Sequence, residues 1–272
     1  MKTGVLIVGG GLAGGLAALA LAARRPGVTV TLVDRAETIG GNHVWSFFDS
    51  DIADADRDIV APLICHRWEG YDIAFPGYAR TLGGTYNTIE SERLDAAVRA
   101  ALPAERVLTG VEVAAIDPAG ATLADGRRID AAGVIDARGF TGAHKLDLGW
   151  QKFMGLLLRL EEPHGLARPV IMDAGVDQID GYRFVYLLPF GEKRIFVEDT
   201  YYTSEAELDQ ALLAERIKAY TRERGWQVAA IEREEAAALP IAMGGDPSRL
   251  WDDAPTARLG MAAGLFHPMT GY

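Results

Sequence analysis

Residues 5–34 decide the fold and read VLIVGGGLAGGLAALALAARRPGVTVTLVD. A short apolar run leads into a cluster of glycines, an Ala/Leu-rich stretch follows, and a second β-branched run ends at Asp34. This order predicts a strand, a glycine turn, a helix from about Leu12 to Ala23 and a second strand over Val28–Val33. Such a βαβ unit of about thirty residues indicates a parallel sheet covered by helices.

The uncharged run Val5–Ala23 also has the length of a membrane-spanning helix, and its small residues resemble the cleavage region of an export signal. The glycines in the middle of the run argue against both interpretations. Each glycine inside a helix costs about 1 kcal/mol relative to alanine. We therefore expect the βαβ unit.

Within this unit, Gly9, Gly11 and Gly14 match the pattern G-x-G-x-x-G. The first glycine permits a tight turn, the second lets the backbone approach a pyrophosphate, and the third allows the helix to pack closely on the strand. The helix N-terminus then offers free N–H groups to phosphates. Asp34 ends the second strand, where a carboxylate accepts hydrogen bonds from ribose hydroxyls. A glycine-rich packing turn would not explain Asp34, so these residues predict a dinucleotide site.

The residues after Asp34 indicate which dinucleotide is bound. Arg35 is followed five residues later by Gly40 and Gly41, an arrangement that resembles the RxxxxGG signature of flavoproteins with two dinucleotide-binding domains. In those proteins the glycine pair backs the FAD pyrophosphate. The segment VIDARG (Val134–Gly139) also resembles that superfamily. We therefore expect FAD, rather than NAD, as the resident cofactor.

Composition excludes several classes of protein. Of 272 residues, 49% are apolar, which is ample for a folded core, and 38 acidic against 27 basic residues give a net charge of −11. So acidic a chain repels phosphate backbones, and we expect no nucleic-acid partner. The single cysteine, Cys65, excludes a disulfide framework and a cysteine-rich metal site, and fits a reducing cytoplasmic setting. The histidines show no metal-ligand spacing, so no metal site is predicted.

Beyond residue 150 the pattern becomes β-rich. Apolar runs alternate with turns up to about Thr200, Ser204 and Glu207 have the spacing of a helix capping box, and Gly225 suits the end of that helix. Leu259–Ala263 is a further candidate for a buried strand. The predicted fold class is therefore α/β. It has a discontinuous Rossmann-type FAD-binding domain over residues 1–150 and 255–272, and an inserted β-sheet plus helix substrate domain over residues 151–254.

Three blocks carry a more specific resemblance. NHVWSFFDSD (Asn42–Asp51) resembles an HTWSFHDSD-like block, RIFVEDTYY (Arg194–Tyr202) resembles an FxEDT motif, and FHPMTGY (Phe266–Tyr272) resembles HPTTGYS. Met269 departs from the small residue usual in the last block. In this order the blocks resemble the bacterial lycopene β-cyclases of carotenoid biosynthesis. Relative to a full-length member the chain is expected to be a fragment that lacks the C-terminal part.

The resemblance implies an activity and its partners. The substrate would be lycopene, whose linear ends become β-ionone rings, giving γ-carotene and then β-carotene, with no net redox change. Reduced FAD would be the working cofactor and NAD(P)H its electron source. Because lycopene is dissolved in membranes, we expect a cytoplasmic protein attached peripherally to the inner face of the cell membrane, through an apolar patch rather than through charge.

Cyclisation requires an acid, a base and stabilisation of a carbocation. Glu198 and Asp199 are the acid–base candidates, and the resembling motif places acid chemistry at the Glu position. Adjacent residues of a strand point to opposite faces, so only one of the two reaches the substrate directly. We predict that Glu198 donates the proton and that Asp199 supports it, with Asp199 as the alternative donor. Apolar surroundings would favour the neutral, donating form of the acid.

The remaining site predictions rest on single residues of the three blocks. Trp45, Phe47 and Phe48 are candidates to line the polyene path, although core packing explains them equally well. In the last block, His267 is expected near the substrate, and Thr270 and Gly271 near the flavin. The other histidines, His43 among them, are expected to be structural or to lie on the surface. Two other classes stay open, namely an FAD-dependent monooxygenase or dehydrogenase acting on an apolar substrate, and a protein that binds FAD without catalysis.

Overall fold

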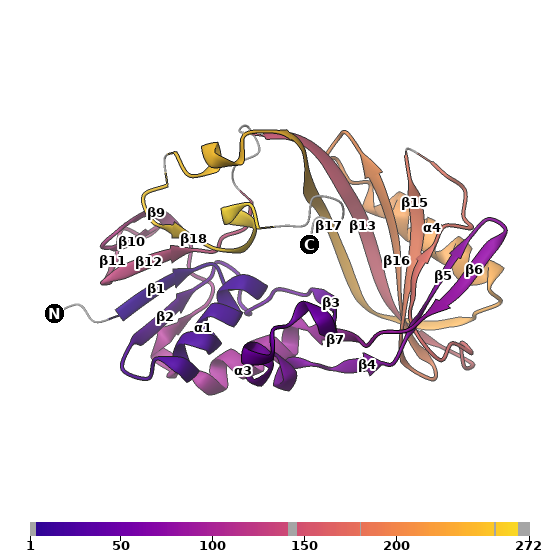
Figure 1. The fold of residues 1–272 in the computed structure, drawn as a ribbon, viewed down its shortest axis with the longest axis horizontal. Coiled ribbons are helices and arrows are strands. Elements are labelled where there is room, and N and C mark those ends of the chain that lie inside the picture. The colour runs from indigo at the N-terminus through magenta and orange to yellow at the C-terminus, as the bar shows by residue number, and fades with distance from the viewer. Residues whose placement is uncertain (1–3, 141–145, 180, 253, 266–272) are drawn as a thin grey trace.

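The predicted βαβ unit forms the centre of one half of the molecule. The computed structural model describes residues 4–140, 146–179, 181–252 and 254–265. In it, β1 (Gly4–Val8) leads through the glycine turn into α1 (Leu12–Arg24) and then to β2 (Thr29–Val33), which pairs parallel to β1. The strand–turn–helix–strand prediction is therefore confirmed (Figure 1).

The strands of this unit belong to a five-stranded sheet with the order β18-β12-β1-β2-β8. Every pairing in the sheet is parallel. Ile7 of β1 faces α1 and α3, whereas Leu6 and Val8 face a small antiparallel sheet on the other side. Both faces of the central strand are thus buried, as expected for parallel sheets. The bounds of these elements are α3 (Ser91–Ala101), β8 (Val107–Leu108), β9 (Val113–Asp117), β10 (Gly120–Leu123), β11 (Arg128–Asp130), β12 (Gly133–Asp136) and β18 (Ala257–Arg258).

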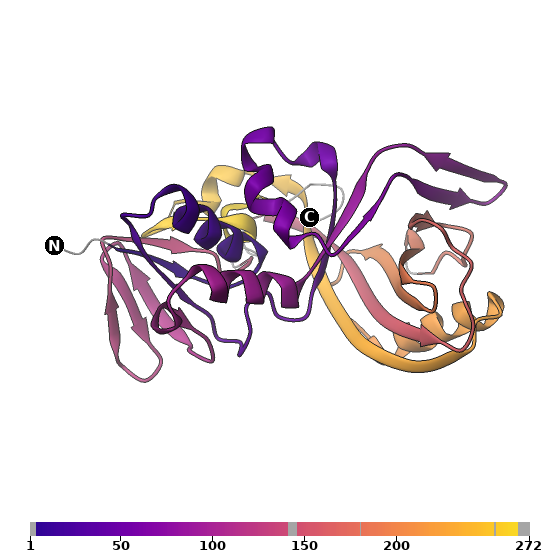
Figure 2. The ribbon, with the colours of Figure 1, turned by 90° about the horizontal axis from the view of Figure 1, so that it is seen from below.

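A larger antiparallel-rich sheet forms the other half of the molecule. Its order is β17-β13-β16-β15-β14-β5-β6, with β5 and β6 as a hairpin at one edge (Figure 2). The hairpin comes from the segment assigned above to the first domain, and the boundary predicted at residue 150 falls inside β13. The strands are β5 (Tyr71–Phe75), β6 (Tyr78–Leu82), β13 (Leu146–Leu160), β14 (Val170–Asp173), β15 (Arg183–Gly191), β16 (Arg194–Thr203) and β17 (Val228–Gly245).

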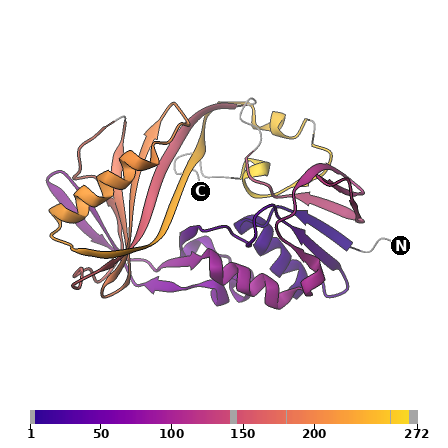
Figure 3. The same cartoon turned by 180° about the vertical axis from the view of Figure 1, so that it is seen from behind.

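The two faces of the large sheet have different neighbours. Helix α4 (Gln210–Glu223) lies across one face, where its Leu213 and Ile217 pack against alternate residues of β16 such as Val197 (Figure 3). The other face carries most of the aromatic side chains of β15 and β16 and packs against a small sheet of three strands. These three strands are β3 (Val44–Phe48), β4 (His66–Trp68) and β7 (Tyr86–Glu90), and short helical turns, including α2 (Arg57–Val60), connect β3 to β4.

Two local predictions are wrong. The helix after β16 does not begin at Ser204: its N-cap is Asp209, whose side chain accepts a hydrogen bond from the Leu212 N–H at 3.0 Å. A carboxylate is an equally good cap, and it stands one position before the helix. Residues 259–263 do not form a strand, because after β18 the chain turns at Gly260, with φ of +61°, into a 3₁₀ turn over Gly260–Ala263.

Candidate active site

The glycine turn between β1 and α1 has the shape that a dinucleotide requires. A Cβ atom on Gly14 would lie 1.9 Å from the carbonyl oxygen of Gly9, and one on Gly9 would lie 2.4 Å from the backbone of Ala137. Both glycines are therefore needed for packing. A Cβ on Gly11 would have nothing within 4 Å, and no side chain caps the N-terminus of α1. Open space in front of free helix N–H groups fits a pyrophosphate.

The segment after β2 closes against this turn. Asp34 accepts hydrogen bonds from the N–H of Gly10 and, at 2.7 Å, from the N–H of Ala36. The N–H of Gly40 donates to the carbonyl oxygen of Gly10 at 2.7 Å, so the predicted glycine pair lies directly on the fingerprint turn. Arg35 is exposed. The structure thus brings the predicted cofactor residues up to Gly41 together, whereas His267, Thr270 and Gly271 lie outside the described residues.

Glu198 lies in the middle of β16 on the face turned away from α4. Its side chain is 5% exposed, and its Oε1 accepts a hydrogen bond from the Thr200 hydroxyl at 2.6 Å. None of the ion pairs among the described residues involves Glu198. Burial, reinforced by the negative charges of Glu235 and Asp199, raises the pKa of Glu198 to about 8. The group is thus a neutral acid at pH 7, as a proton donor must be.

Asp199 points to the opposite face, as the alternation of a strand requires. It is 0% exposed, and both of its oxygens accept hydrogen bonds from the Arg183 guanidinium, at 2.9 Å to Oδ1 and 2.6 Å to Oδ2. The Arg183 side chain is 7% exposed. Asp199 is therefore one half of a buried ion pair on the α4 side of the sheet, which fits the supporting role predicted for it.

An aromatic cluster covers the face that carries Glu198. Tyr186 lies directly opposite Glu198 on β15, and its hydroxyl is 2.7 Å from that of Tyr86. Burial raises the pKa of Tyr86 to about 12, so this hydroxyl stays neutral. Phe196 and Phe190 continue the cluster with nearly parallel rings 6.3 Å apart. Aromatic faces of this kind are able to stabilise a cation in apolar surroundings.

The aromatic residues predicted from the NHVWSFFDSD block divide between two cores. Trp45 and Phe47 pack against the core of the nucleotide-binding half. Phe48, on the other face of β3, packs in the aromatic cluster, 4.9 Å from the ring of Tyr86. The strand alternation therefore separates them, and the packing favours Phe48 over Trp45 and Phe47 as a wall of the site. A substrate-lining role for Trp45 or Phe47 stays a prediction.

Two residues of the site were not identified from the sequence. Glu235 of β17 is 3% exposed, with its Oε1 2.8 Å from Nδ1 of His43 and its Oε2 accepting from the Val44 N–H at 3.0 Å. His43, expected to be structural or on the surface, thus pairs with a buried carboxylate. The only signal for His43 in the sequence was its place inside the NHVWSFFDSD block. Its pairing with Glu235 left no signal, because 192 positions separate the two residues.

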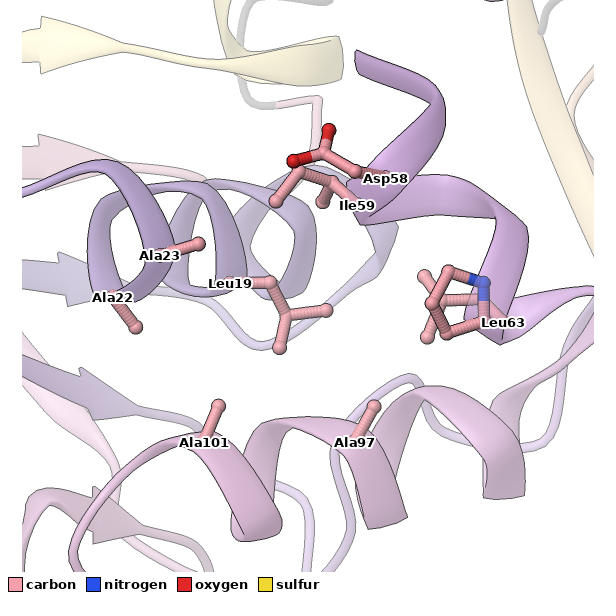
Figure 4. A pocket seen from close by; sticks show the side chains of 9 residues that line it. Leu19, Ala22, Ala23, Asp58, Ile59, Leu63, Ala97 and Ala101 are labelled. Atoms are coloured by element: carbon pink, nitrogen blue, oxygen red, sulfur yellow. The ribbon is translucent and has the colours of Figure 1, made fainter.

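A separate pocket of about 320 Å³ lies between α1, α3 and the segment Asp58–Leu63 (Figure 4). Its walls are alanine, leucine, isoleucine and proline side chains together with Asp58, and none of the predicted site residues lines it. Asp58 is exposed and paired with Arg24 at 2.8 Å, so this pocket does not offer a buried acid of the kind that Glu198 provides. Within the described part of the chain, no cluster of histidine, cysteine and carboxylate side chains could hold a metal ion.

Comparisons with known proteins agree on the family and the fold. The model of the family described as "Lycopene cyclase protein" matches residues 4–272. A lycopene beta-cyclase of Pseudescherichia vulneris is 43% identical over 269 residues, which cover 98% of this chain and 69% of that protein. One of Pantoea ananas is 40% identical over 268 residues, covering 98% and 70%. The solved structure of a flavin-dependent halogenase from Xanthomonas campestris matches with a TM-score of 0.66 at 15% identity, covering 100% of this chain and 68% of that one. The predicted α/β fold is thus confirmed.

Proposed function

The chain belongs to the lycopene cyclase protein family, and from this premise we propose that it converts the linear ends of lycopene into β-ionone rings without net redox change. The observation that carries the proposal is Glu198. It is a buried carboxyl without a cationic partner among the described residues, held neutral at pH 7, on a sheet face lined by aromatic rings. This is the acid that protonation of a hydrocarbon double bond demands.

The reaction assigns a task to each group. Glu198 donates its proton to the terminal double bond, the neighbouring alkene attacks the resulting cation, and loss of a ring proton completes the β-ionone ring. The rings of Phe196, Tyr186 and Tyr86 exclude water and face the cation. The Arg183–Asp199 pair holds β15 to β16 behind the acid. When bound, reduced FAD supplies negative charge that stabilises the cation.

The experiment that tests this function is an anaerobic incubation of the FAD-loaded protein with lycopene under reducing conditions, followed by analysis of the carotenoids. We expect monocyclic and bicyclic products with no stoichiometric consumption of reductant. A hydroxylated or desaturated product would identify a monooxygenase or dehydrogenase instead. Absence of any product, with FAD bound, would leave only a binding role. The same assay, with NADH or NADPH as the sole reductant, tests whether either nucleotide is the electron source.

FAD is the proposed cofactor, and Gly11 provides its test. We expect Gly11→Val to lose bound flavin while the protein stays folded. The new side chain meets no protein atom within 4 Å of its Cβ, but it occupies the space where the backbone approaches the pyrophosphate. The measurement is flavin absorbance per protein chain after gel filtration. Gly27→Val is the matched control, since a Cβ there also meets nothing within 4 Å. Full flavin occupancy of Gly11→Val would show that the glycine turn does not hold the flavin.

Membrane contact follows from the substrate. Among the described residues, no helix combines the length and apolar character needed to cross a bilayer. We infer peripheral attachment on the cytoplasmic side through apolar contacts, because a chain of charge −11 gains little from anionic lipids. Membrane-bound protein should therefore resist a wash with high salt and be released by mild detergent. Complete release by salt alone would show that the attachment is electrostatic.

A further inference from the structure

A second buried carboxyl shares a sheet face with Glu198. In the pairing of the large sheet, Glu235 lies opposite Gly155, and Gly155 lies opposite Glu198. Residues directly opposite each other on neighbouring strands point to the same face. Strands are about 4.8 Å apart, so about 10 Å of backbone separates the two glutamates. The donor thus faces, across one strand, another carboxyl that the mechanism above does not use.

The space between the two glutamates is apolar. Gly155 has no side chain there, and a Cβ on it would lie 2.1 Å from Cζ of Phe196. The Phe196 ring therefore covers this position and separates the two carboxyls. The acid Glu198 therefore lies on one side of this ring, and Glu235 with its partner His43 lies on the other.

His43 is oriented by its contact with Glu235. The carboxylate is an acceptor, so Nδ1 of His43 carries the hydrogen that joins them across 2.8 Å. The lone pair is then on Nε2. A carboxylate that accepts from Nδ1 stabilises this tautomer in a histidine base. Nε2 has no hydrogen-bond partner among the described residues and lies 3.9 Å from the position of a Cβ on Gly41, beside the cofactor cradle. The side chain is 41% exposed.

We propose that His43, oriented by Glu235, is the base that removes the ring proton, an inference that rests on the proposed function. After ring closure the C–H bond next to the cationic carbon breaks, its electron pair forms the ring double bond, and the proton passes to Nε2. Nothing is oxidised or reduced. Glu235 stabilises the imidazolium, the exposed ring returns the proton to water, and Glu198 is reprotonated for the next cycle.

The other histidine near the cluster, His66, also contacts a carboxylate, but its ring is stacked against aromatic side chains. Nε2 of His66 is 3.2 Å from Oε1 of Glu90, and its ring stacks on Phe190 with centroids 4.0 Å apart. The described structure thus gives this histidine a packing role within the cluster. His43, in contrast, lies between Glu235, which shares the sheet face of Glu198, and Gly41 of the glycine pair.

The test is the product of His43→Gln in the FAD-loaded protein. Glu198 still protonates lycopene in this variant, so the cation still forms but loses a proton from a different neighbouring carbon. We expect β-ring formation to fall by about 10²-fold, and rings with a displaced double bond to become a major product, as measured by chromatography and NMR. Glu235→Gln should shift the product ratio in the same direction. Imidazole added to His43→Gly should restore β-rings.

The product ratio is the readout, because a merely structural role of His43 would not change it. His164→Gln is the matched control, because His164 bonds the Gly191 carbonyl oxygen rather than a carboxylate. Flavin content and a thermal transition verify that each variant is folded. An unchanged rate and product in His43→Gln overturns the inference, and so does loss of all ring types with flavin retained. If the unsubstituted protein forms no rings, the proposed function itself fails.

Discussion

Replacing Glu198 with glutamine is expected to lower the rate of ring formation by about 10²–10⁴-fold, the usual contribution of general acid catalysis. Glutamine keeps the volume of the side chain and still accepts the hydrogen bond from Thr200, but it cannot donate a proton of useful acidity. Flavin binding should stay normal. The measurement is the initial rate of β-ring formation from lycopene, with flavin content determined on the same sample.

The pH dependence of the same reaction gives an independent check. The pKa of Glu198 is raised to about 8, mainly by burial, so the donating form predominates below that value and is lost above it. The rate of the unsubstituted protein should therefore decline as pH rises through about 8, and the residual rate of Glu198→Gln should lack this decline. In heavy water, deuterium should enter the ring at the carbon protonated first. A Glu198→Gln variant with a normal rate and normal deuterium incorporation would transfer the donor role to Asp199.

The second large effect is expected at Asp199, on stability rather than on chemistry. Asp199→Asn should lower the free energy of unfolding by about 3–5 kcal/mol, as when one partner of a buried ion pair is removed. Arg183 would remain buried with its charge unpaired, and the new amide N–H₂ would face its guanidinium. This is a large part of the 5–15 kcal/mol that typically stabilises a folded domain. The measurement is urea denaturation followed by circular dichroism.

The control for this prediction is Asp125→Asn, which removes a carboxylate from an exposed pair with Arg127 and should change stability little. If Asp199→Asn unfolds like the unsubstituted protein but cyclises far more slowly, then Asp199 acts in the chemistry and the assignment of the two faces is wrong. If Asp199→Asn loses stability but its folded fraction cyclises lycopene at the normal rate, then Asp199 has the supporting role.

Much of the nucleotide-binding half was predictable because its signals are local. The βαβ unit and the close contact of Gly14 with Gly9 each depend on residues within about thirty positions of one another. Where two local signals compete, the prediction was wrong, as at the start of the helix after β16. Both Ser204 and Asp209 are good N-caps, and the choice between them depends on which turn of the helix packs on the sheet through Leu213.

The sequence by itself determined the class of fold and predicted the cofactor cradle, because glycine patterns and strand alternation act over short distances; it offered Glu198 and Asp199 as candidates through the resemblance of their motif. Only the tertiary structure decided which face each side chain meets. It directs Asp199 to Arg183, sends Trp45 into one core and Phe48 into the other, and joins His43 to Glu235. The physical reason is register: long antiparallel strands decide which residues lie opposite each other, and that pairing depends on packing across the whole sheet.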